Sequence, residues 1–235
     1  MNASVLRLCS VAVFSFLAIG SAEIGAGDPD TLTVASLQGA YDLKMDAMPV
    51  DPTGGHGFSM VSESLRIEAD TLTFAPTFEG TGRFALAGNT LTVTDSTGNR
   101  DVVQVTLSDA GNRLTLVDQI GMDVETFVFT RRDGSGRSDE VTEANLQGTY
   151  DLDATGTTAG TLVFLVSGEL RIAGNIVTTS LTFSQTRSFT LAGNTITLAE
   201  ADGDTTVLRA SLSDDGDTLT LTFVEDRDTF VYERR

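Results

Sequence analysis

Along most of the chain, apolar and polar residues alternate one by one. The clearest runs are TLTF at 71–74, TLTV at 90–93, VQVTL at 103–107 and RLTL at 113–116. A period of two is typical of a β-strand with one buried and one wet face, and threonine suits the wet face. Short segments rich in Gly, Asn and Asp separate the runs and favour tight hairpins. Because no segment after residue 22 sustains a helical period, the pattern predicts an all-β fold.

The alternating pattern occurs twice, because the chain contains an internal duplication. LQGAYDL at 37–43 recurs as LQGTYDL at 146–152, and FALAGNTLTV at 84–93 recurs as FTLAGNTITL at 189–198. The offset is 105 residues from about Leu65 to Leu116, without a gap. Two copies make a tandem, whereas a solenoid needs three or more repeats.

The duplication sets the expected domain boundaries. We expect a leader at 23–34, copy one at 35–132, a polar linker at 133–143 and copy two at 144–235. Each copy is long enough to close its own hydrophobic core.

Eight strands are expected in copy one, connected as a meander of hairpins. An eight-stranded meander removes its exposed edges most simply by closing into an up-and-down β-barrel. We therefore expect two tandem eight-stranded antiparallel barrels, with two β-sandwiches as the alternative. The expected strands lie near 37–44, 60–68, 71–76, 82–87, 90–95, 101–108, 113–118 and 124–131.

The opening L-x-G-x-Y-x-L, the Gly-Asn hairpins and a last strand that ends in arginine resemble the lipocalin-like (calycin) domains of bacterial secreted proteins. In that family, a Gly-x-Trp on the first strand packs against an arginine from the end of the barrel. The resemblance implies structural, barrel-closing roles for Gly39 with Tyr41 and Gly148 with Tyr150, against Arg131 or Arg132 and Arg234 or Arg235. Tyrosine stands here where the family has tryptophan.

The first 22 residues indicate export. An arginine at position 7, an apolar run from Leu8 to Ile19 and the small residues Gly20, Ser21 and Ala22 are typical of a secretory signal peptide. The run is shorter than the roughly 20 residues of a membrane-spanning helix, although a retained anchor is the alternative. We expect a periplasmic or secreted protein that loses Cys9 with its signal and has no transmembrane segment after cleavage.

Charge and composition exclude several classes of function. The net charge of −18 argues against nucleic acid, which needs a Lys/Arg surface. With one Cys and one His, His56, neither a zinc site nor a Cys–His pair is expected. His56 lies in a Gly-rich loop and is the best catalytic candidate, but a loop residue is the simpler interpretation. Acidic segments at 200–204 and 214–217 could bind calcium weakly, although hairpin turns explain them too. We expect no cofactor, no metal and no catalytic residue.

The remaining candidate site is the inward-facing apolar surface, which can be a filled core or a small ligand cavity. Copy one adds a longer loop with methionines, which adapt to irregular apolar ligands and could form a lid. The ligand-binding candidates are Tyr41, Met45, Met48, Phe58, Met60, Phe84, Phe127, Phe129, Tyr150, Phe189, Phe230 and Tyr232.

These observations favour an exported, non-enzymatic lipocalin-like protein that binds a small apolar ligand. The first alternative is an interaction or inhibitor module of the envelope or the extracellular space, with filled barrel cores and a protein partner. The second is a calycin-type enzyme. A single large outer-membrane barrel fits less well, because the outward faces carry Thr, Arg and Asp.

Overall fold

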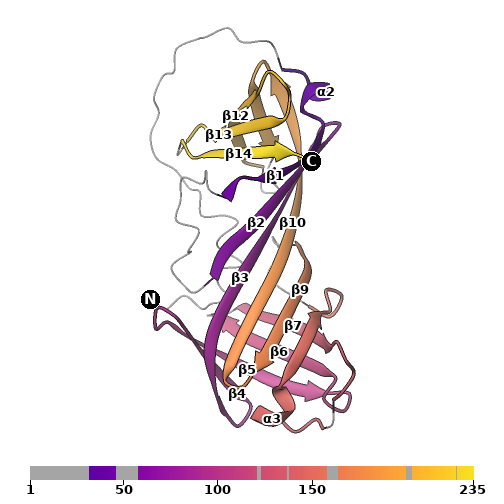
Figure 1. Ribbon diagram of the computed structural model, residues 1–235, viewed down its shortest axis with the longest axis vertical. Coiled ribbons are helices and arrows are strands. Elements are labelled where there is room, and N and C mark those ends of the chain that lie inside the picture. The colour runs from indigo at the N-terminus through magenta and orange to yellow at the C-terminus, as the bar shows by residue number, and fades with distance from the viewer. Residues whose placement is uncertain are drawn as a thin grey trace. The chain divides into compact units, whose positions relative to one another are not determined.

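The computed structural model describes residues 32–45, 58–120, 123–136, 138–157, 164–199, 203–225 and 227–235 (Figure 1). The expected signal peptide, His56 and Met48 lie outside these residues. The all-β prediction is confirmed, and the only helices in the described part are α2 (Val34–Leu37) and α3 (Glu143–Leu146). The strands are β1 (Gly39–Leu43), β2 (Phe58–Glu68), β3 (Thr71–Ala87), β4 (Thr90–Asp95), β5 (Arg100–Ser108), β6 (Arg113–Ile120), β7 (Asp123–Arg131), β8 (Gly148–Leu152), β9 (Phe164–Ala173), β10 (Ile176–Ala192), β11 (Thr195–Ala199), β12 (Thr205–Leu212), β13 (Thr218–Phe223) and β14 (Thr229–Arg234).

The fourteen strands form one closed antiparallel ring in which each strand pairs with its neighbours in the chain. The ring closes through β1 and β14, where Tyr41 is the register partner of Arg234. In addition, β3 pairs with β10. This extra pairing divides the ring into two circuits, one made of β3 to β10 and the other of β1 to β3 with β10 to β14.

The two longest strands correct the expected strand pattern. Separate strands at 71–76 and 82–87 were expected, but β3 is continuous from Thr71 to Ala87, and β10 has the same length. β10 contains no Gly, Pro, Asn or Asp that could close a hairpin. Threonine, serine and apolar residues instead continue the strand. β3 contains Pro76, Gly80 and Gly82 but is continuous as well, and it pairs with β10.

The compact units of the structure do not follow the two copies. Among the described residues, unit 1 comprises 58–60 and 77–183, and unit 2 comprises 32–45, 61–76 and 184–235. The boundaries expected at residues 132 and 144 therefore fall inside unit 1. Each unit combines the first part of one copy with the last part of the other, so the strands are not distributed as one closed sheet per copy.

The segment expected as a flexible linker between copies lies within unit 1 and contacts its β5–β6 turn. The Gly111 amide donates a hydrogen bond to Asp139 at 3.0 Å, and the Gly136 amide donates one to the Asn112 side chain at 2.9 Å. A Cβ at position 136 would lie 2.5 Å from the Ala110 carbonyl oxygen, so glycine is needed for this close approach. The segment therefore joins β7 to α3 and β8 of the same unit.

The period of two places one face of each strand in a core. On β5, Val103, Val105 and Leu107 are buried, while the residues between them are exposed. In unit 1 the core also takes residues from β4, β6, β7 and β9. In unit 2 the buried set includes Leu65, Leu72, Ile196, Leu208 and Leu219.

Candidate functional site

One end of each unit is closed by a short helix together with a tyrosine and an arginine. In unit 1, Arg131 is 7% exposed and its guanidinium carbon lies 4.7 Å from the centre of the Tyr150 ring. The guanidinium donates hydrogen bonds to the Tyr150 hydroxyl at 2.5 Å, to the Asn145 carbonyl at 2.6 Å and to the carbonyl of Gln147. The Tyr150 hydroxyl in turn donates to the carbonyl of Leu146 on α3. Helix α3 is thereby tied to the sheet.

Unit 2 repeats the arrangement with residues from opposite copies. The Arg234 guanidinium carbon lies 5.2 Å from the centre of the Tyr41 ring and donates hydrogen bonds to the Tyr41 hydroxyl at 2.6 Å and the Ser36 carbonyl at 2.8 Å. The Tyr41 hydroxyl donates to the carbonyl of Leu37 on α2. Closure within each copy would have placed Tyr41 against an arginine of copy one, whereas its partner comes from copy two.

The two arginines at each strand end have different surroundings. Arg131 and Arg234 pack on the tyrosine rings, whereas Arg132 and Arg235 form ion pairs with Asp151 and Asp42 on the surface. The hydrogen bond and charge of Arg235 lower the pKa of Asp42 despite the opposing effect of desolvation.

Glycine is required beside each closing tyrosine. Gly39 and Gly148 have φ angles of +153° and +148°, and a Cβ at Gly39 would lie 3.4 Å from the Tyr41 ring and 3.6 Å from Arg234 Nε. At Gly148 a Cβ would meet the Arg131 guanidinium. The glycines therefore allow ring and guanidinium to lie directly against the strand.

The aromatic residues expected to line a cavity are buried against other side chains. Those in unit 1 lie in one core cluster with Leu114 and Val105. Met45 and Met60 are partly buried, and the side chain of Phe58 lies outside the described part of the protein. Exposed fractions of the aromatic candidates are 7% or less for Tyr41, Phe84, Phe127, Phe129, Tyr150, Phe189, Phe230 and Tyr232.

The end of each unit away from the closing tyrosine and arginine is called the loop end. We define it by the C-terminal ends of β1, β11 and β13 in unit 2, and of β4, β6 and β8 in unit 1. In unit 2, Leu43 on β1 is the register partner of Tyr232 on β14, and the β1–β2 register runs from Gly39 opposite Ile67 to Asp42 opposite Ser64, the residue next to Glu63. Three neighbouring strands thus place Leu43, Tyr232 and Glu63 at one level toward the loop end.

Glu63 is the acidic member of this group, and the sequence analysis missed it. The Tyr232 hydroxyl donates a hydrogen bond to Glu63 Oε1, and Tyr232 is 2% exposed. Burial raises the pKa of Glu63 to about 7, opposed by the hydrogen bond from Tyr232. Burial, followed by the charge of Glu63, also raises the pKa of Tyr232. The available signal was parity, because Glu63 has the same alternation as the buried Leu65 and Ile67.

The same level of unit 1 has a different chemistry. Gly168 and Phe129 occupy the positions that correspond to Glu63 and Tyr232. A Cβ at Gly168 would lie 2.6 Å from Leu181 Cδ2 and 3.4 Å from Leu152 Cβ, so leucine side chains fill this space. The acid–tyrosine pair is therefore specific to unit 2.

Toward the loop end, the two units differ in polarity. Unit 1 has Asp101, Asp118 and Glu125 buried there, with Asp118 and Glu125 as register partners, and each of the three has an interaction partner. Unit 2 has Phe223 at the position of Asp118, with its ring 5.6 Å from the Phe230 ring in an edge-on arrangement. Unit 2 thus has an aromatic residue where unit 1 has Asp118, and the partly buried Glu63 lies at the same end.

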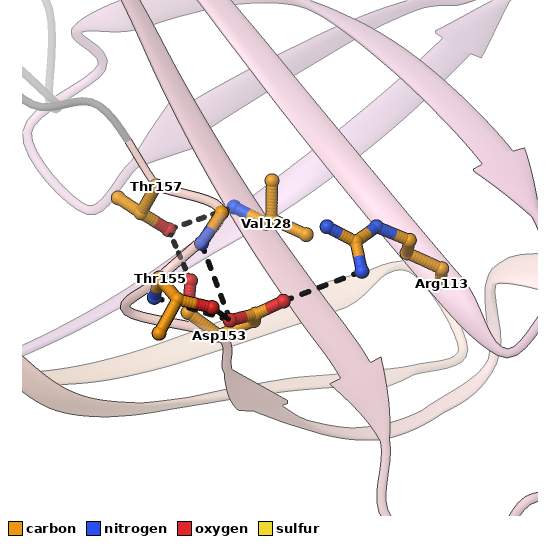
Figure 2. A network of polar contacts seen from close by, with 6 residues as sticks. Arg113, Val128, Asp153, Thr155 and Thr157 are labelled. Carbon is orange, nitrogen blue, oxygen red and sulfur yellow. Dashed lines mark hydrogen bonds and ion pairs between the residues drawn. The ribbon is translucent and has the colours of Figure 1, made fainter.

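A polar network begins the β8–β9 connection of unit 1 (Figure 2). Asp153 accepts hydrogen bonds from the Thr155 hydroxyl at 2.6 Å and from the amides of Thr155 and Gly156, and forms an ion pair with Arg113 at 3.3 Å. Thr157 accepts a hydrogen bond from the Val128 amide and donates one to the Asp153 carbonyl. The hydrogen bond from Thr155 is the main cause that lowers the pKa of Asp153. The network fixes the loop to β7.

The acidic segment at 214–217 forms a turn. Asp215 accepts hydrogen bonds from the Ser213 hydroxyl at 2.5 Å and from the Asp217 amide at 3.1 Å. Within the described ranges, no three His, Cys, Asp or Glu side chains are arranged to hold a metal ion. Of the other acidic segment, residues 200–202 lie outside those ranges.

Comparisons with protein families, curated proteins and solved structures found no match to this chain. Among the residues that the structure describes, no helix is both long enough and apolar enough to cross a membrane.

Proposed function

We propose that this protein is an exported, non-enzymatic binding protein, and that unit 2 holds a small, largely apolar molecule at its loop end. The observation that carries the proposal is the Glu63–Tyr232 pair, which introduces one polar contact among apolar inward-facing residues. Ligand sites in proteins typically combine an apolar lining with a few placed polar groups. An apolar molecule with a hydroxyl or amine group would match a carboxyl at this position.

The comparison of the two units supports the choice of unit 2. Both units have a closed end with a helix, a tyrosine and an arginine, so closure alone does not distinguish them. Only unit 2 has the acid and tyrosine, and only unit 1 has the three buried acids at its loop end. The two units therefore share their closed end and differ at the loop end, which is where we place the ligand in unit 2.

The lipocalin-like resemblance supports the same function. We propose that each unit is an eight-stranded, lipocalin-like up-and-down barrel, with strands contributed by both copies. Such a barrel encloses side chains or one small ligand. The apolar N-terminal run and its small-residue site support export to the periplasm or the medium.

The test is ligand capture by the full chain. Native mass spectrometry of protein purified from its own host should reveal a bound small molecule that is released on denaturation. In a parallel assay, Nile red, a neutral probe, and cis-parinaric acid, a fluorescent fatty acid, should gain fluorescence on binding. A protein that is empty from its host and leaves both probes unbound would contradict the proposal.

Two variants locate the site. Glu63→Leu should weaken binding of the captured molecule about tenfold or more, because one charge-assisted or neutral hydrogen bond is worth about 1–2 kcal/mol. Phe129→Tyr adds a hydroxyl at the matched position of unit 1 and should leave binding unchanged. Equal losses in the two variants would assign the effect to stability rather than to a site in unit 2.

A second function is favoured by a separate observation. Each aromatic candidate whose side chain the structure describes is exposed by 7% or less, which is typical of filled cores. With filled cores, the protein would act through its outer faces and loops as an interaction or inhibitor module. A tagged protein that binds no small molecule but retains one envelope protein at stoichiometric amounts would support this function.

A further inference from the structure

Unit 2 is assembled from two segments that are far apart in the chain. The first segment, 33–76, contributes α2, β1, most of β2 and the start of β3 through its described residues 33–45 and 61–76, while its residues 58–60 belong to unit 1. The second segment, 184–235, contributes the end of β10 and β11 to β14. We call the first segment the arm. The chain between the two segments belongs mostly to unit 1, whose core cluster contains only residues between Phe84 and Val177.

The arm is held by contacts along both of its sides. On the β1–β14 side, Tyr41 and Asp42 bind Arg234 and Arg235. On the β3–β10 side, the Phe189 amide donates a hydrogen bond to the Asp70 carbonyl at 2.8 Å. The inward Tyr232–Glu63 hydrogen bond is also a contact between the arm and the second segment.

The β3–β10 pairing is self-complementary between the copies. Thr73 bonds Thr186 at 2.8 Å, and the counterpart residues Thr178 and Thr81 are paired at 3.5 Å. The Phe189–Asp70 bond likewise has a counterpart in the bond from the Phe84 amide to the Asn175 carbonyl, at 2.9 Å. In both cases, when one residue contacts another, their counterparts in the opposite copies contact each other as well. This reciprocity is typical of an interface between two copies of one protein.

At the middle of the β3–β10 pairing, a residue of copy one contacts the equivalent residue of copy two. Thr77 and Thr182 are separated by 105 positions and their hydroxyls lie 2.9 Å apart. Phe78 and Phe183 have the same separation, and their rings lie 5.9 Å apart in an edge-on arrangement. Pro76 directly precedes this point and is the last residue of the arm.

We propose that the arm is exchangeable, so that segment 33–76 completes unit 2 either in its own chain or in a second copy of this chain. All the arm contacts named above are with the second segment of unit 2, and a second chain presents the same residues. The partner is therefore another copy of the protein, joined by reciprocal exchange of arms. Exchange requires a change of chain direction near Pro76 and Thr77 and the release of residues 58–60, at the start of β2, which belong to unit 1.

Mass action sets the expected yield. An arm tethered to its own chain has an effective concentration on the order of 1 mM. Refolding at about 1 mM protein should therefore give roughly equal amounts of closed monomer and exchanged dimer. At about 10 µM, the dimer should hold only about one fiftieth of the chains.

A disulfide reports which chain holds the arm. Asp42 and Glu233 are register partners on β1 and β14, so Asp42→Cys with Glu233→Cys, in a Cys9→Ser background, places two thiols within bonding distance. Oxidation should give a disulfide within one chain in the monomer and between two chains in the exchanged dimer. The matched control is Thr130→Cys with Asp151→Cys, the equivalent register partners on β7 and β8 of unit 1.

The protein is unfolded in urea, refolded at the two concentrations, oxidised and separated under non-reducing, denaturing conditions. We expect covalent dimers of the Asp42/Glu233 variant that increase at least tenfold between 10 µM and 1 mM, whereas the control variant forms its disulfide within one chain. Light scattering of the unsubstituted protein after chromatography should show a non-covalent dimer with the same concentration dependence. Absence of dimer from the unsubstituted protein at 1 mM, or equal covalent dimer from both variants, would overturn the proposal.

Discussion

Glu63 should make the stability of unit 2 decrease between about pH 4.5 and pH 7. Burial raises the pKa of this carboxyl from 4.5 to about 7, so the folded protein keeps the proton over a range in which the unfolded chain has lost it. The stabilisation is complete below pH 4.5 and is lost as the pH rises through 7. An interval of about 2.5 pH units, at 1.36 kcal/mol each, corresponds to about 3 kcal/mol at most.

The perturbation that isolates this effect is Glu63→Gln. Glutamine keeps an oxygen that accepts the Tyr232 hydrogen bond but carries no charge at any pH. The variant should match the unsubstituted protein near pH 4 and exceed its stability by up to about 3 kcal/mol at pH 8. With a urea dependence of about 2 kcal/mol per M, the unfolding midpoint would rise by about 1.5 M.

The assay is urea unfolding at half-unit pH steps from 4 to 8. Hydrogen exchange of peptides from β2 and β14 assigns the transition to unit 2. The control is Glu68→Gln, because Glu68 lies on the same strand but is exposed and paired with Arg66. We compare the difference in unfolding free energy between each variant and the unsubstituted protein, because this difference removes the general pH dependence of a strongly acidic chain. If the unfolding free energy of Glu63→Gln differs from that of the unsubstituted protein by the same amount from pH 4 to pH 8, the reasoning is refuted.

Three further substitutions test the closed ends and unit 1. Arg131→Ala should cost about 3 kcal/mol in urea unfolding because it removes the donor to the Tyr150 hydroxyl and to three backbone carbonyls, while the adjacent Arg132→Ala should leave the midpoint nearly unchanged. Gly168→Ala should destabilise unit 1 by about 1–3 kcal/mol through overlap with Leu181, whereas exposed Ser167→Ala should be neutral; equal effects would contradict the packing argument. Asp153→Ala should accelerate amide hydrogen exchange at Thr155 and Gly156, and unchanged exchange would show that the carboxylate does not hold this loop.

Much of the closing arrangement could be anticipated from the sequence. The resemblance pointed to Gly39, Tyr41 and the C-terminal arginines, and the structure places these residues together at one end of unit 2. The sequence analysis left open which of two adjacent arginines packs on the ring, although strand alternation distinguishes them, because Arg234 has the parity of the buried Phe230 and Tyr232. Arg234 faces the ring and Arg235 faces Asp42.

Glu63 illustrates what pattern alone leaves open. Its parity assigns it to the inward face, but a glutamate at such a position can also lie at a strand end in water. Only the pairing of β1 with β14 brings Tyr232 to its side, because the two residues are separated by 169 positions in the chain. The raised pKa therefore depends on tertiary structure.

By itself, the sequence determined that the protein is a duplicated all-β chain, and it located most strands, because local alternation and turn residues specify strands and hairpins. Only the tertiary structure decided which copy each strand pairs with. The two copies present nearly the same inward residues, closing tyrosine and arginine, so either copy can satisfy the hydrogen bonds of the other. The strands that connect the two units show this most clearly: β10 has no turn residues, whereas β3 has Pro76, Gly80 and Gly82 and is extended all the same, paired with β10.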